Sequence, residues 1–118
     1  MEITSVKFML MAQDMARAIR FYHAVIGLEV KFESPEWTEL AYGDAIVALH
    51  GGGKGELRTT GLGFQVKDIR AACREVEAGG GKIASPPMER PGEPIILAEV
   101  VDTEGNQFSL TEYRAPSA

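Results

Sequence analysis

The chain has 118 residues, of which 45% are hydrophobic and 25% are charged, and this composition describes one globular domain with a sizeable core. The formal net charge of −5 argues against nucleic acid or an anionic membrane surface as the main partner, since both favour basic proteins. We expect no secretory leader and no membrane span, because no apolar run is long enough. A single cysteine, Cys73, excludes an internal disulfide, and together these features predict a cytoplasmic protein.

One pattern occurs twice along the chain. Residues 7–27 and residues 61–81 each contain a short apolar strand, an aspartate, an amphipathic stretch of helical periodicity and a closing glycine. The offset that separates Asp14 from Asp68 also pairs Gly27 with Gly81. A repeat of this length is a supersecondary unit, and two copies predict one domain built from two similar modules.

The first half is expected to fold as a strand, a helix and three more strands. Residues 3–11 form the first expected strand, and Asp14 is a helix N-cap that begins an apolar helical face. Pro35 and Gly43 mark the turns that separate the later strands. These strands are predicted at residues 28–33, 37–42 and 45–50.

The second half repeats this order after a glycine-rich linker. A strand at 61–66 and a helix at 68–79 are followed by strands at 82–86, 95–102 and 106–112. Four prolines between residues 86 and 94 interrupt the last strands, and the tail is expected to fray. We therefore predict a single domain with module one at 1–50, the linker at 51–60, module two at 61–112 and the tail at 113–118.

Two motifs accompany this order of elements, FYHAVIGLEV at residues 21–30 and VVDTEGNQFSL at residues 100–110. Together with the order of elements they resemble the vicinal oxygen chelate superfamily, which holds glyoxalase I, bleomycin-resistance proteins and extradiol dioxygenases. The resemblance covers nearly the whole chain and implies an α+β fold, in which two tandem βαβββ modules form a cup-shaped mixed sheet with helices on the outer face. The reaction does not follow from the fold, because these relatives carry out unrelated chemistry in one cup.

The resemblance also implies where a metal would bind. In metal-using relatives four side chains inside the cup hold a divalent ion. When the chain is aligned with these relatives on the shared motifs, the four positions correspond to Lys7, Ala48, Gly61 and Ser109. A lysine ammonium has no lone pair, alanine and glycine have no side-chain donor atom, and one serine hydroxyl is a poor ligand. The only histidines, His23 and His50, do not replace the missing set. We therefore predict no metal and no cofactor.

Alternation along the strands predicts which side chains line the cup. If Lys7 points inward, the same parity brings in the adaptable apolar side chains of Met9 and Met11. Aromatic residues on the second and third strands are candidates for stacking on a planar ligand. The predicted ligand-binding residues are Lys7, Met9, Met11, Phe32, Trp37, Tyr42, His50, Gln65, Glu99, Gln107 and Ser109.

Structural roles remain open for several of these residues. Met9 and Met11 are also suited to a core, and the aromatic residues to packing in the core or at a dimer seam. Lys7 is also suited to a structural ion pair with Glu99, whose facing is open. The proline-rich segment at 86–94 is either a cover over a cavity mouth or a stiff connector.

The apolar cup and the missing ligand set favour a metal-independent protein that sequesters a partly aromatic, toxic or antibiotic compound, as bleomycin-resistance-like relatives do. The alternative is an enzyme of the same superfamily, a lyase or isomerase acting on a carbonyl compound, with Lys7, His50 and Glu99 as candidate reactive groups. A third hypothesis is a metal-dependent lyase of the glyoxalase I type. Relatives commonly complete their half-cups by pairing, so we expect a homodimer with two equivalent sites.

Overall fold

Module one begins with strand β1 (Lys7–Ala12), followed by helix α1 (Met15–Arg20) and one wider helical turn, η1 (Phe21–Val25). The Asp14 carboxylate accepts a hydrogen bond from the Arg17 backbone N–H and so caps α1, as predicted. The predicted first strand starts too early, because residues 3–6 are exposed and outside the sheet. The remaining strands are β2 (Glu29–Phe32), β3 (Trp37–Tyr42) and β4 (Ala45–Gly51).

Module two repeats this order with strand β5 (Arg58–Gln65) and helix α2 (Ile69–Ala78), which Asp68 caps. Strand β6 (Lys82–Glu89) runs through Pro86 and Pro87, although the sequence placed these prolines in a loop. Because β6 lies at a sheet edge, prolines that lack an N–H are tolerated there. The last strands are β7 (Ile95–Val101) and β8 (Asn106–Tyr113).

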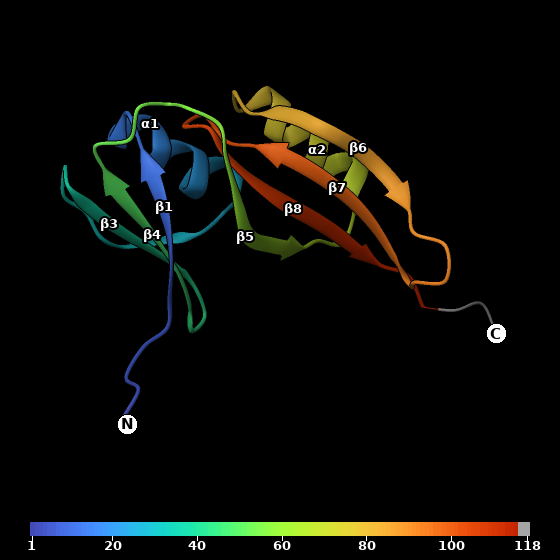
Figure 1. Ribbon diagram of the computed structural model, residues 1–118, viewed down its shortest axis with the longest axis horizontal. Coiled ribbons are helices and arrows are strands. Elements are labelled where there is room, and N and C mark those ends of the chain that lie inside the picture. The colour runs from blue at the N-terminus through green and yellow to red at the C-terminus, as the bar shows by residue number, and fades with distance from the viewer. Residues whose placement is uncertain (116–118) are drawn as a thin grey trace.

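The computed structural model describes residues 1–115, so the last three residues of the predicted tail lie outside the described part. Each module contributes one four-stranded mixed sheet, in the orders β1-β4-β3-β2 and β5-β8-β7-β6. In both sheets the first strand is parallel to the last strand of its module, and the other pairs are antiparallel. Figure 1 shows the two sheets side by side, with the helices on one side and the other faces open. This is the α+β fold that the sequence predicts.

The core lies between the sheets and their helices. Phe21 and Tyr22 are almost completely buried, and both rings pack near the ring of Phe108 on β8. Cys73 is a buried thiol of this core, and burial raises its pKa. Because the helical turn of module one packs against a strand of module two, the two modules share one core.

Buried polar side chains from the turn before β8 join the modules. The Asn106 side chain accepts a hydrogen bond from the Met11 backbone N–H at 3.2 Å and donates one to the Met11 carbonyl at 2.7 Å. Glu104 accepts hydrogen bonds from the backbone N–H groups of Gln13 and Asp14, and pairs with Arg17 at 2.8 Å. These contacts tie the end of β1 and the start of α1 to the start of β8 and the turn before it, and so join the two modules.

Candidate functional site

The open face of the first sheet collects side chains from three strands. The register between β1 and β4 places Lys7, Met9 and Met11 opposite residues 46, 48 and 50. The register between β4 and β3 continues these rows to residues 41, 39 and 37. Phe8 and Leu10 face the core instead, as alternation predicts. Met9, Met11 and His50 therefore share one face, as expected, and Met9 is 50% exposed.

Glu39 stands at the centre of this face, and the sequence reasoning missed it. One carboxylate oxygen, Oε2, accepts hydrogen bonds from Lys7 Nζ at 2.8 Å and from Trp37 Nε1 at 2.7 Å. The hydrogen bond from Lys7, followed by the one from Trp37, holds the pKa of Glu39 below its usual range. The signal was present in the sequence, because Glu39 follows Trp37 by two residues on one strand and therefore shares its face.

The ion pair of Lys7 with Glu39 replaces the pair with Glu99 that the sequence analysis left open. Glu99 lies on β7 of the other sheet, where Ser109 Oγ donates a hydrogen bond to it at 2.9 Å. His50 is on β4, exposed, with Nδ1 close to the carbonyl oxygen of Gly51. The structure thus does not bring Lys7, His50 and Glu99 together as one reactive group within the chain.

The three aromatic candidates divide between two faces. Trp37 is half-buried on the open face, and the His50 ring lies edge-on to it with 6.1 Å between centroids. Phe32 is the register partner of Glu39 and is 56% exposed, so it borders the same face. Tyr42 is five positions from Trp37 and points to the opposite face, where it is 78% exposed. Tyr42 is therefore not part of the surface around Trp37.

The open face of the second sheet carries the remaining predicted residues. Ser109 is the register partner of Gly63 on one side and of Glu99 on the other, so Glu99 faces outward with it. Gln107 lies two positions before Ser109 on the same face. Gln65 is the register partner of Thr111, which is the next pair on the same face after Gly63 and Ser109. The facing of Glu99, which the sequence analysis left open, is thereby settled.

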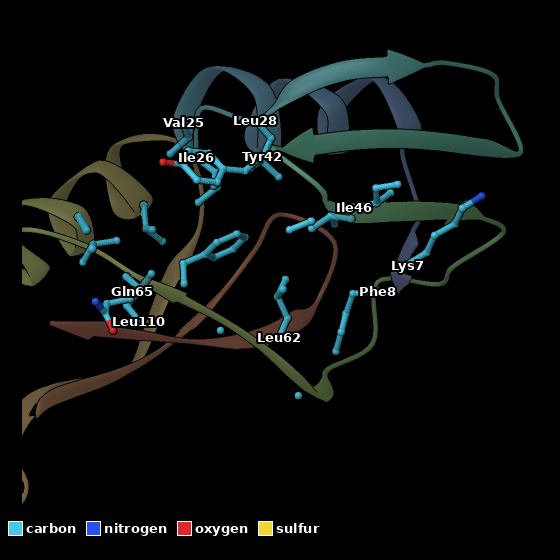
Figure 2. A pocket seen from close by; sticks show the side chains of 18 of the residues that line it. Lys7, Phe8, Val25, Ile26, Leu28, Tyr42, Ile46, Leu62, Gln65 and Leu110 are labelled. Carbon is cyan, nitrogen blue, oxygen red and sulfur yellow. The ribbon is translucent and has the colours of Figure 1, made fainter. Parts of the chain in front are cut away.

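A cavity of about 730 Å³ is lined by residues of both modules. Figure 2 shows Phe8 and Ile46 of module one facing Leu62 and Leu110 of module two across it. The lining is mainly apolar, and of the predicted site residues it includes Lys7, Tyr42 and Gln65. Residues of β1 and β5 line this cavity, and each of these strands pairs with another strand along only one edge.

A smaller cavity of about 320 Å³ lies on the open face of module two. Leu97 and Glu99 of β7 form its floor, and the proline-rich segment forms its wall. The complete lining is Ser85, Pro86, Met88, Glu89, Arg90, Pro91, Leu97 and Glu99. The segment therefore borders a cavity as well as connecting two strands.

A family model described as the Glyoxalase/Bleomycin resistance protein/Dioxygenase superfamily matches residues 4–110. The chain belongs to this superfamily. A comparison with curated proteins finds no significant match.

Several solved structures have the same fold as this chain. A member from Sphaerobacter thermophilus is 21% identical with a TM-score of 0.77, and the match covers 94% of this chain and 98% of that one. The genomically encoded fosfomycin resistance protein FosX from Listeria monocytogenes is 15% identical with a TM-score of 0.77, covering 95% and 94%. TioX from Micromonospora is 19% identical with a TM-score of 0.74, covering 94% and 99%.

The positions that hold a metal ion in metal-using members of the superfamily do not fit one here. Lys7 is an ammonium paired with Glu39, and Ser109 donates its hydroxyl hydrogen to Glu99. Ala48 and Gly61 offer no donor atom. Across residues 1–115, no three His, Cys, Asp or Glu side chains cluster closely enough to hold a metal ion.

None of the helices described within residues 1–115 is long and apolar enough to span a membrane.

Proposed function

We propose that this member of the superfamily binds a small, partly aromatic molecule on its open sheet faces, without a metal ion, and sequesters it. The observation that carries the proposal is the Trp37–Glu39 arrangement. The indole is held by a carboxylate on a face that also exposes Met9 and Phe32. An ordered aromatic ring beside adaptable apolar side chains and a few polar groups is typical of a small-molecule site.

We further propose that two copies of the chain complete the site. In the single chain the two open faces lie side by side rather than facing each other (Figure 1). Both β1 and β5 line the apolar cavity and have an edge without a strand partner, and such an edge is a template for pairing with another chain. A homodimer is consistent with these edges and predicts two equivalent sites.

Trp37 supplies a direct test, because it is the only tryptophan of the chain. Metal-stripped protein is titrated with planar aromatic antibiotics and carbonyl metabolites, and both Trp37 fluorescence and melting temperature are recorded. A true ligand quenches the fluorescence and stabilises the fold, by about 2.7 kcal/mol at about a hundredfold excess over its Kd. Trp37→Ala should abolish this stabilisation, whereas the control Tyr42→Ala on the opposite face should retain it.

Two results contradict the proposal. The first is stabilisation by nickel, zinc or iron, which brings the metal-dependent lyase forward. The second is conversion of a bound carbonyl compound by metal-stripped protein, which identifies an enzyme. Light scattering of the same samples tests the dimer.

A further inference from the structure

The internal repeat places one carboxylate at the same position on the open face of each module. In each sheet one row of register partners runs from the first strand through the last to the third. The rows are Met9, Ala48, Glu39 and Gly63, Ser109, Glu99. The offset that relates Asp14 to Asp68 also relates Met9 to Gly63. Glu39 and Glu99 are therefore equivalent members of the two modules.

The two carboxylates differ in how their charge is compensated. Glu39 pairs with Lys7, but the residue equivalent to Lys7 in module two is Gly61. Within residues 1–115, Glu99 forms no ion pair, and the only hydrogen bond to its carboxylate is the one that Ser109 donates to Oε1. Oε2 thus keeps its capacity to accept a hydrogen bond, and a carboxylate in this position attracts a cation.

The smaller cavity, whose floor includes Glu99, contains two further charged side chains, Glu89 and Arg90. Its other charged side chains are already paired, Glu89 with Arg114 at 2.8 Å and Arg90 with Glu93 at 3.0 Å. Pro86 and Pro91 have no backbone N–H, and the two side-chain donors of the lining, the Ser85 hydroxyl and the Arg90 guanidinium, do not hydrogen-bond to Glu99. Met88 and Leu97 add apolar surface. Glu99 is therefore the one charged side chain of this small recess that has no ion-pair partner among residues 1–115.

We propose that this recess binds a protonated amine, with Glu99 accepting its hydrogen bond and Met88 and Leu97 contacting the carbon atoms beside it. The inference rests on the proposed function and specifies it: among the small molecules that bind on the open faces, those with a cationic nitrogen bind in the recess of module two. The amine contact is a charge-assisted hydrogen bond, which is about twice as strong as a neutral one.

The test uses two probes with the same ring, benzylamine and benzyl alcohol, titrated into the protein and followed by NMR. Benzylamine should bind about tenfold more tightly than benzyl alcohol, and added salt should reduce the difference. Glu99→Gln keeps the acceptor for Ser109 but removes the charge, so it should abolish the preference. Glu89→Gln is the matched control, since Glu89 lines the same recess with its charge paired, and it should keep the preference.

Equal affinity for the two probes, an unchanged preference in Glu99→Gln, or no binding at millimolar concentration would each overturn the amine assignment. The fluorescence of Trp37 separates this failure from failure of the proposed function. If aromatic compounds quench Trp37 while benzylamine shows no preference, the site binds small molecules and only the amine assignment is wrong.

Discussion

The hydroxyl group of Tyr22 donates a hydrogen bond of 2.6 Å to the carboxylate of Asp102, and both groups are buried. Asp102 also accepts hydrogen bonds from the backbone N–H groups of Glu104 and Asn106. Burial raises the pKa of Asp102, although the hydrogen bonds from Tyr22 and Asn106 act in the opposite direction. Burial and the charge of Asp102 raise the pKa of Tyr22 well above its usual range. Tyr22 of module one is therefore hydrogen-bonded to the turn between β7 and β8 of module two.

Replacing Tyr22 with Phe should lower the free energy of unfolding by about 2 kcal/mol, because it leaves a buried carboxylate short of one donor. Urea denaturation measures this loss. Tyr42→Phe is the control, since that side chain is 78% exposed and its hydroxyl should contribute little. Equal effects of the two substitutions would show that the hydrogen bond to Asp102 adds nothing to stability.

Glu104 should make stability depend on pH. Burial alone would raise its pKa, but hydrogen bonds from Arg17 and the Asp14 backbone outweigh burial, so the pKa is lowered from its usual value of 4.5. A lowered pKa means that the ionised form favours the folded state. The stabilisation is complete above pH 4.5 and is lost as pH falls through the lower pKa of the folded protein.

Glu104→Gln removes the charge that Arg17 and the backbone N–H groups stabilise, so at neutral pH its free energy of unfolding should be lower than that of the wild type by about 2 kcal/mol. The loss is not larger, because Arg17 is partly exposed and solvent weakens the ion pair. This difference should shrink as the solution is acidified. Asp102 has a raised pKa, which favours the folded state at low pH and so changes stability in the opposite direction. Because Asp102 is present in both proteins, the difference between them reports the contribution of Glu104 alone. Glu77→Gln, on an exposed helix position, should follow the wild-type curve. A constant difference at all pH values would rule out Glu104 ionisation as the cause.

Glu39→Ala should alter the environment of Trp37 with little effect on stability. The ion pair with Lys7 is partly exposed, and such pairs contribute less than about 1 kcal/mol. The indole N–H loses its carboxylate partner and meets water, so the fluorescence emission should shift to longer wavelength. Glu29→Ala removes a more exposed ion pair with Lys31 and should leave the emission unchanged. An unshifted spectrum in Glu39→Ala would mean that the hydrogen bond between Trp37 and Glu39 is not formed in solution.

Gly105→Ala should destabilise the protein by more than about 2 kcal/mol. Gly105 has a φ of 95°, and a Cβ there would overlap the carbonyl of Glu56 and lie 2.8 Å from the carbonyl oxygen of Gly55. Gly92 has a φ of 80° with nothing near its missing Cβ, so Gly92→Ala carries only the conformational cost of about 1 kcal/mol. Thermal unfolding of the two variants measures the difference. Similar melting temperatures would show that the turn moves to accommodate the side chain.

The fold was predictable from sequence because local signals and the repeat agree. Asp14 and Asp68 cap their helices, and alternation on β8 separates Phe108 and Leu110 from the outward-facing residues between them. Alternation also placed Met9 and Met11 correctly. Tyr42 was grouped with Trp37 by residue type, although odd spacing on one strand already puts them on opposite faces.

The partner of Lys7 was not predictable in the same way. It depends on the spatial order of the strands, in which β3 lies beyond β4, and on a diagonal contact across that order. Spacing along the chain puts Glu39 on the same face as Trp37 but does not show that it meets Lys7, so Glu99 was considered as the partner instead. The course of β6 was missed for a related reason, since prolines are compatible with a strand only when it lies at a sheet edge.

Equivalent positions of the two modules hold Lys7 and Gly61, and this difference has an evolutionary consequence. A duplicated gene segment offers selection two copies of every position, and a change in one copy leaves the other intact. The first copy keeps its carboxylate internally neutralised, whereas the second leaves the equivalent charge available. A single ancestral half-domain can in this way acquire two unlike surfaces without any change in its backbone plan.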